Sequence, residues 1–279
     1  MRSIQLTKWL AVGAIALLFG QRRARRSVTK LIADLSAPSS GVAPRLDALG
    51  LEQLPAPVAR YLQRVLPEDR AHLHGVTLKQ RGRLRTTAAS DRWMPFSATH
   101  VANAGEPGFV WDAQVKVMPF FHIGVLDKLT HGTGAGRVAL MSLLKVAGDA
   151  GSPELNSGAL HRYLAEAVWY PAALLPSDRL RWTAIDPYTA LATLSDGSSE
   201  VSLEFRFSES DEVESVFAEE RWGLFDGRYE QRPWEGHFSR YERIDAVLIP
   251  TRGEVGWYQE GRLDIVWKAE VADAKFMMN

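Results

Sequence analysis

Strict alternation between apolar and polar side chains is the feature that most constrains this chain. From 201 to 207 every second residue is apolar, so Val201, Leu203, Phe205 and Phe207 share one face of an extended strand. The same period runs from Val76 to Arg85. A helix cannot use this period, because its side chains repeat every 3.6 residues. The chain therefore folds mainly as antiparallel sheet, with one covered and one solvated face.

The predicted strands follow one another through short turns. Asp226-Gly227, Glu260-Gly261 and the stretch 195–198 carry the residues typical of tight hairpins, and Gly132–Gly136 also indicates a hairpin. Such connections favour an antiparallel meander. Besides the two strands above, we predict strands at Trp93–Val101, Phe109–Val117, Phe120–Leu129, Arg137–Leu143, Arg179–Ile185, Ala190–Leu194, Val213–Arg221, Val247–Tyr258 and Leu263–Ala269, the last with all its odd-numbered residues on one face.

Two helices interrupt the strand pattern. One is predicted from Leu54 to Leu66, and the other from Ala159 to Leu175, with Ser157 as its N-cap and a kink at Pro171. A long curved sheet needs a cover for its concave face, and the second helix is apolar enough to provide it. The predicted fold is α+β and mainly β: a large curved antiparallel sheet forming a half-open barrel, covered by a kinked helix, with an N-terminal membrane helix.

The membrane helix is predicted from the first thirty residues. Ile4 to Gly20 is an apolar run of 17 residues, interrupted by Lys8, which is the lower limit for a membrane-spanning helix. Arg22, Arg23, Arg25 and Arg26 follow it, which favours an uncleaved anchor over a cleaved signal peptide. We divide the chain into an anchor at 1–27, a linker at 28–50 and a single β-rich domain at 51–279.

The distribution of charge indicates the partners. Residues 1–30 contain seven basic and no acidic side chains, which leaves 26 basic against 33 acidic in the rest. Such a body is not suited to nucleic acid, whereas the four arginines favour anionic lipid headgroups. By the positive-inside rule the body lies on the cytoplasmic face of a bacterial cytoplasmic membrane, the alternative being an extracytoplasmic body. The absence of cysteine excludes thiol chemistry and Cys-ligated metals.

Three segments resemble a bacterial family of unknown function. They are Leu54–Leu62 (LPAPVARYL), Gly108–Trp111 (GFVW) and Arg162–Pro171 (RYLAEAVWYP), and the resemblance covers about residues 50 to 275. The family is uncharacterised, so the resemblance implies no particular chemistry. In architecture, the predicted half-barrel resembles the lipoprotein carriers of the bacterial envelope.

Candidate site residues lie on and around the covering helix. Arg162 and Glu166 are four residues apart and share a helix face, so they either contact a ligand or form a structural ion pair. Trp93, Trp111 and Trp169 are candidates for the wall of an apolar pocket. We expect no cofactor and no metal, because His72 and His74 have no third ligand at a recognisable spacing.

The function that these patterns favour is binding of a hydrophobic or lipid-like ligand in the concave face of the half-barrel. In that role Arg162 and Glu166 contact the polar end of the ligand, and the tryptophans contact its apolar end. One alternative is an enzyme, a hydrolase or isomerase that acts on such a ligand with Glu166 as its base. Another is a non-catalytic interaction scaffold with a filled core. No recognised catalytic motif is present, which favours a non-enzyme.

Overall fold

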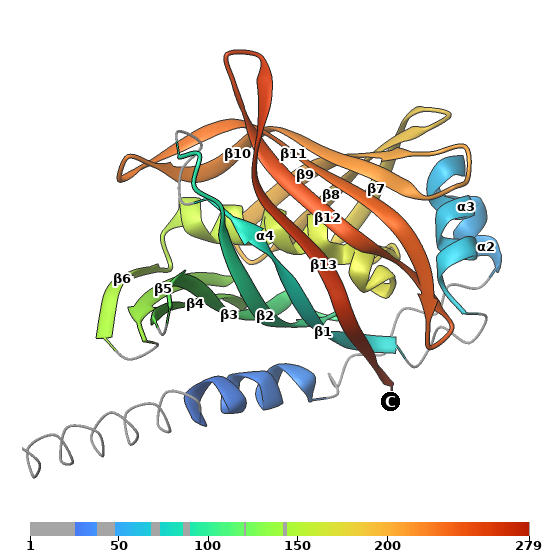
Figure 1. Cartoon of the computed structure of the whole chain (residues 1–279). Coiled ribbons are helices and arrows are strands. Elements are labelled where there is room, and N and C mark those ends of the chain that lie inside the picture. Colours follow the sequence, from blue (N-terminus) through green and yellow to red (C-terminus); the bar gives the residue numbers. More distant parts are fainter. Residues whose placement is uncertain are drawn as a thin grey trace, which may run out of the picture.

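One antiparallel sheet of 13 strands organises the computed structural model, which describes residues 26–37, 48–67, 73–85, 90–119, 121–141 and 144–278. The strand order is β6-β5-β4-β3-β2-β1-β13-β12-β11-β10-β9-β8-β7 (Figure 1). The strands are β1 (Leu73–Leu84), β2 (Met94–Asn103), β3 (Gly108–Met118), β4 (Phe121–Thr130), β5 (Thr133–Leu140), β6 (Leu144–Ala150), β7 (Leu180–Asp186), β8 (Thr189–Asp196), β9 (Ser199–Phe207), β10 (Val213–Phe225), β11 (Arg228–Ile244), β12 (Val247–Gln259) and β13 (Arg262–Met278).

The sheet is a meander in two halves. The β1–β13 pair joins the two halves. From β1, strands β2 to β6 follow in chain order to one edge of the sheet, and from β13, strands β12 to β7 follow in reverse chain order to the other edge. The sheet curls into a half-barrel whose edges, β6 and β7, are not paired with each other. The predicted meander and half-barrel are therefore confirmed.

The covering helix differs from its prediction in both extent and shape. Helix α4 (Pro153–Glu166) begins after Ser152, whose side chain accepts a hydrogen bond from the Leu155 amide; Ser157 is not the cap. The predicted single kinked helix is wrong. The chain continues as two 3₁₀ turns, η2 (Ala167–Trp169) and η3 (Pro171–Leu174), separated by Tyr170, whose φ of −138° and ψ of 65° are not helical. Proline at 171 provides no amide hydrogen for a continuing helix, so the helix breaks here rather than bending.

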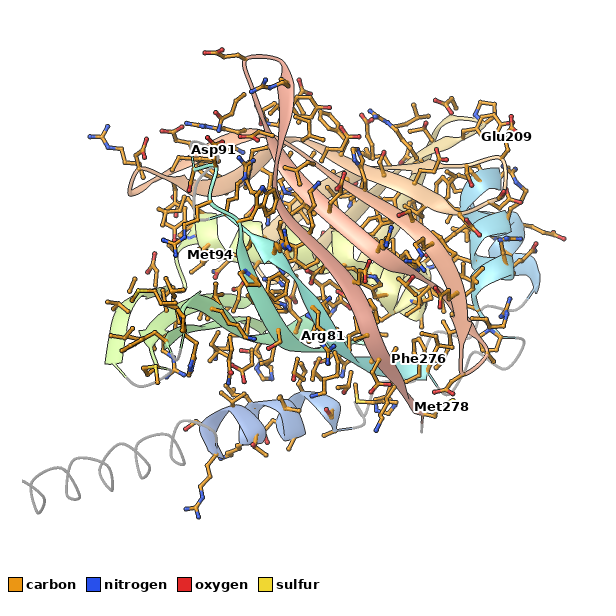
Figure 2. All side chains as sticks on the ribbon, in the orientation of Figure 1. Arg81, Asp91, Met94, Glu209, Phe276 and Met278 are labelled. Atoms are coloured by element: carbon orange, nitrogen blue, oxygen red, sulfur yellow. The ribbon has the colours of Figure 1, made fainter. Side chains whose placement is uncertain are left out.

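Helix α4 lies against the concave face and connects the two halves of the sheet. It contacts β4 and β5 on one side and β8, β9 and β10 on the other (Figure 1). Its residues Leu160, Tyr163 and Leu164 are buried. Side chains occupy the space between the helix and the sheet (Figure 2).

Other helices lie outside this concave face. Helices α2 (Ala48–Glu52) and α3 (Ala56–Val65) lie at one end of the sheet, where α3 contacts β8 and β12 (Figure 1). Residues 26–36 are helical and span the end of the expected anchor at 1–27 and the start of the expected linker at 28–50. The carbonyl of Leu35 accepts a hydrogen bond from Asn103 at 3.2 Å. None of the helices in the described residues has the length and hydropathy needed to cross a bilayer. The predicted anchor run lies outside the described residues.

Alternate residues predicted to share one face of a strand do so, except where a β-bulge interrupts the strand. On β9 the four alternate residues from Val201 to Phe207 are all buried. On β13, by contrast, Val255 pairs with Trp267 while the next residue, Gly256, pairs with Ile265, so β13 contains one extra residue. A bulge reverses the facing of every residue beyond it. Ile265 and Trp267 therefore lie on opposite faces of the sheet. The prediction that all odd-numbered residues from 263 to 269 share one face is wrong.

Candidate ligand-binding cavity

A cavity of about 300 Å³ lies between the concave face of the sheet and α4. Its lining comes from both halves of the sheet, from α4 and from η2. Strands β10 to β13 contribute residues near the β10–β11 and β12–β13 hairpins, so the cavity lies toward that end of the half-barrel. Five tryptophans form most of its apolar wall: Trp111, Trp169, Trp234, Trp257 and Trp267.

Hydrogen bonds fix two of these rings. The indole nitrogen of Trp111 donates to the Gln80 side chain at 2.9 Å, and that of Trp169 donates to the Pro250 carbonyl at 3.0 Å. The Trp169 ring packs over Gly253, where a Cβ atom would lie 3.1 Å from the ring. The wall is therefore held in place by the protein before any ligand binds.

Five charged side chains line the same cavity. Arg85 forms an ion pair with Asp264, and we call the other four the charged cluster: Asp127, Arg162, Glu166 and Arg221. Arg162 is their centre. Its guanidinium lies 2.5 Å from Asp127 Oδ2 and 2.9 Å from Glu166 Oε1. The same guanidinium lies 4.9 Å from the ring centroid of Phe109 and 5.0 Å from that of Trp111, within the range of a cation–π interaction.

Burial shifts the pKa values of this cluster. It raises the pKa of Asp127 and of Glu166, and the nearby Arg162 opposes the rise in both without cancelling it. For Arg162 burial acts to lower the pKa, but its two carboxylate partners outweigh burial and raise it. Arg162 therefore stays charged, while the carboxyl groups bind protons more readily than exposed ones.

Arg221 reaches the cavity because of a second bulge. Ala218 of β10 pairs with Trp234 of β11, and Arg221 pairs with Arg232. Between these two pairs β10 advances by three residues and β11 by two, so β10 contains one extra residue. Arg221 lies 4.8 Å from the Trp234 ring centroid and 5.0 Å from that of Trp257. It donates to the Gly158 carbonyl at 3.1 Å, and burial followed by the charge of Arg162 lowers its pKa to about 10.

Several polar atoms at this site have no hydrogen-bond partner among the described residues. They include Arg221 Nε, Glu166 Oε2 and both ring nitrogens of His100. His100 Nε2 lies 3.6 Å from Glu166 Oε2, and burial, followed by the charge of Arg162, keeps the pKa of His100 well below its usual range. Buried polar atoms without partners carry a free-energy cost, which a ligand at this position can remove.

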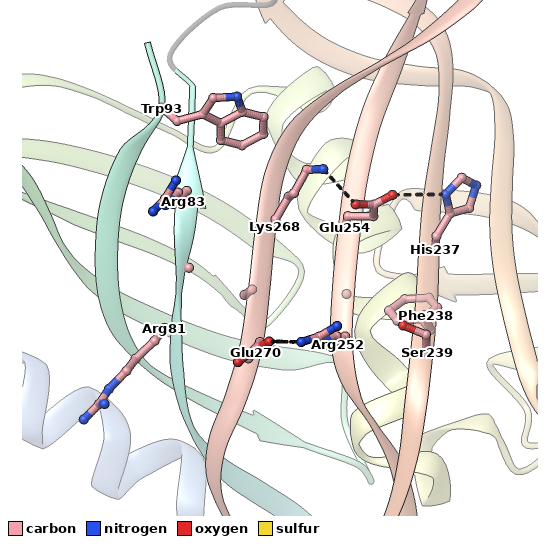
Figure 3. Close-up of a pocket in the computed structure, with 13 residues that line it drawn as sticks. Arg81, Arg83, Trp93, His237, Phe238, Ser239, Arg252, Glu254, Lys268 and Glu270 are labelled. Carbon is pink, nitrogen blue, oxygen red and sulfur yellow. Dashed lines mark hydrogen bonds and ion pairs between the residues drawn. The ribbon is translucent and has the colours of Figure 1, made fainter. Parts of the chain in front are cut away.

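The structure brings together four of the five residues predicted for the site. Trp111, Arg162, Glu166 and Trp169 line the same cavity. Trp93 does not, because it precedes β2 on the opposite face and lines a groove of about 890 Å³ on the outside of the sheet (Figure 3).

Charges on that outer groove are largely paired with one another. Arg252 binds Glu270 at 2.7 Å, and Lys268 lies 3.2 Å from Glu254 (Figure 3).

Four residues of the cavity wall were not predicted from the sequence: Arg221, Trp234, Trp257 and Trp267. Because residues two apart on a strand share a face, the sequence could have indicated that Trp257 lies on the same face of β12 as Val255. Nothing in the sequence marks the bulge that turns Arg221 inward.

No cluster of three or more potential metal ligands occurs among the described residues. His74 is buried in β1, with Nε2 3.4 Å from the Ser36 carbonyl.

Comparison with known proteins places the chain in a family. The profile of the family of unknown function DUF6544 matches residues 45–269, which confirms the resemblance to an uncharacterised family, and the chain belongs to it. No curated protein matches.

Two solved structures are similar to the chain. A DUF1329 family protein from Desulfovibrio piger has 11% identity and a TM-score of 0.43, covering 82% of this chain and 92% of that one. A LolA superfamily protein from Nitrosomonas europaea has 12% identity and a TM-score of 0.32, covering 83% and 94%.

Proposed function

We propose that this DUF6544 family member binds a hydrophobic or amphiphilic ligand in the cavity between α4 and the concave face of its sheet. The observation that carries the proposal is the composition of the cavity wall. Five tryptophans provide apolar surface, and the charged cluster provides polar groups beside it. Apolar walls with a few fixed polar groups are typical of small-molecule sites.

The volume of the cavity limits the size of the ligand. At about 300 Å³ it lies at the lower end of the range for ligand pockets, so it suits a small amphiphile or one chain of a larger lipid. Because Trp111 and Trp169 are held by hydrogen bonds, binding requires little ordering of the wall, and this favours affinity.

Filling the cavity should weaken binding. Val255 lines it and is flanked on the neighbouring strands by Gly236 and Trp267, so Val255→Phe places a ring in the ligand space. We expect the affinity for the neutral fluorescent probe N-phenyl-1-naphthylamine to fall about tenfold or more, measured by titration of the full chain.

The matched control is Val146→Phe, the same change at a side chain that is 68% exposed on β6. It should leave probe affinity unchanged. Equal affinity in the parent and in Val255→Phe would contradict a ligand cavity and would favour an interaction scaffold. The expectation that Glu166 acts as a catalytic base stays a prediction.

Membrane attachment through the N-terminal segment is a further part of the proposal. It is supported by the apolar run Ile4–Gly20 and by the arginines at 22, 23, 25 and 26. Replacing these four arginines by glutamine should weaken co-sedimentation of the full chain with vesicles containing anionic lipid. Vesicles of neutral lipid are the control, and equal binding to both would contradict the role of the arginines. With the arginines on the C-terminal side of the run, the body would lie on the cytoplasmic face.

A further inference from the structure

The unpartnered atoms of the charged cluster indicate which polar group the ligand carries. Arg221 Nε is a buried donor without an acceptor among the described residues, and Glu166 Oε2 is a buried acceptor without a donor. The first needs an oxygen from the ligand, and the second needs a proton.

We propose that the ligand is a medium-chain carboxylate, that Arg221 binds its carboxylate group, and that Glu166 takes up a proton as it binds. The inference rests on the proposed function, because it names the ligand class of the same cavity.

Arg221 is the cation available to an added anion. Arg162 already has two carboxylate partners, at 2.5 and 2.9 Å, and Arg85, also in the cavity wall, is paired with Asp264. Arg221 forms no ion pair among the described residues, and its hydrogen bond is to a neutral carbonyl. It lies beside the rings of Trp234 and Trp257, so the anion that it binds is adjacent to apolar wall for the chain of the same ligand. Arginine is well suited to carboxylates, because its planar fork of donors matches their two oxygens.

Charge balance requires the proton. Arg85 is neutralised by its ion pair with Asp264, and with both carboxylates ionised the two arginines and two acids of the cluster also sum to zero. A bound carboxylate would therefore leave one uncompensated negative charge. Burying such a charge is costly, and buried groups neutralise instead. Burial also raises the pKa of Glu166, with Arg162 opposing the rise, which makes its carboxyl group a ready proton acceptor.

Glu166 is the better of the two acids for this proton. Its side chain is 13% exposed, against 28% for Asp127. Arg162 binds one oxygen of each acid, but among the described residues only Glu166 has its second oxygen, Oε2, buried without a hydrogen-bond partner. The ionisable groups that face Glu166 are Arg162 on its own helix, His100 on β2, Asp127 on β4, Arg221 on β10 and Tyr170 beyond η2. The neutral His100 adds no charge of its own.

The first test compares decanoate with decan-1-ol, which has the same chain and no charge. We expect the parent protein to bind decanoate about tenfold or more tightly than the alcohol, as a charge-assisted hydrogen bond to a buried group implies. In Arg221→Gln this preference should disappear while the affinity for the alcohol is kept. Arg232→Gln is the control, because Arg232 is the cross-strand neighbour of Arg221 but is paired with Glu230 at 2.6 Å.

The second test measures protons. Calorimetric titration of the parent protein with decanoate, in two buffers of different ionisation enthalpy, should show uptake of about one proton per ligand near neutral pH. Glu166→Gln, which mimics the protonated acid, should bind decanoate without this uptake, whereas Arg232→Gln, which leaves the charged cluster unchanged, should keep it.

The outcomes distinguish the carboxylate ligand from the more general proposal of an apolar ligand cavity. Binding of the alcohol with no preference for decanoate, or decanoate binding with no proton uptake in the parent, would overturn the carboxylate assignment and leave the apolar cavity standing. Binding of neither compound, with no binding of the neutral naphthylamine probe, would overturn the proposed function itself. The measurements on the parent protein do not depend on the folding of any variant.

Discussion

Replacing Arg162 by methionine should lower the free energy of unfolding by about 3 kcal/mol or more. The change keeps an apolar stem and removes the charge, so Asp127 and Glu166 lose their common partner within a largely buried site. The cation–π contacts to Phe109 and Trp111 are lost with it. Equilibrium denaturation of the parent and the variant, at one pH and with equal denaturant dependence, gives the difference.

Two controls show whether the loss comes from the uncompensated carboxylates. The variant Asp127→Asn/Arg162→Met/Glu166→Gln removes all three charges together, and most of the lost stability should return, because a buried ion-pair group is worth little against neutral replacements. Arg179→Met removes an ion pair with Asp196 in which the arginine side chain is 45% exposed, and it should cost less than about 1 kcal/mol. If Arg162→Met and Arg179→Met cost the same, the cluster does not act as a buried network.

Predictions from the sequence succeeded where one local rule applied along a whole element. The seven residues of the 201–207 pattern fall on β9, and the turns at Asp226-Gly227 and Glu260-Gly261 lie in the left-handed backbone region that such hairpins require. Strand β11 (Arg228–Ile244) was missed because its sequence includes Pro233 and many charged residues, which resemble a loop. Its pairing with β10 and β12 forms it nonetheless, so neighbouring strands override local preference.

A site residue could be predicted only where the regular spacing of its helix or strand continues without a bulge. Arg162 and Glu166 were found because helical spacing alone places them on one face. Arg221 was not, because it faces the cavity only through the extra residue in β10, and the sequence around it continues as an exposed acidic strand. Trp93 was misplaced for the related reason that it lies one residue before the buried Met94, where alternation sends it outward. Single-residue shifts of register therefore decide what the cavity contains.

Acid should destabilise the protein through His161. This residue of α4 is 5% exposed, and burial, followed by the charge of Arg221, lowers its pKa from 6.5 to about 3 in the folded state. Between these two values the unfolded chain binds a proton that the folded chain does not, so the stabilising contribution is complete above about pH 6.5 and is lost as the pH falls toward 3. The His161 contribution should fall by about 2–3 kcal/mol between pH 7 and pH 4.5.

The measurement is the difference between the parent and His161→Asn in free energy of unfolding as a function of pH. Asparagine keeps a donor near the position of Nδ1, which lies 3.2 Å from the Ser157 carbonyl, so the hydrogen bond survives while the titration does not. The parent curve alone is not sufficient, because His100 acts in the same direction, and Asp127 and Glu166, whose pKa values are raised, act in the opposite one. His131→Asn, at an exposed turn position with positive φ that asparagine tolerates, should keep the parent slope. Parallel curves for the parent and His161→Asn would mean that folding does not shift the pKa of His161, and would contradict this prediction.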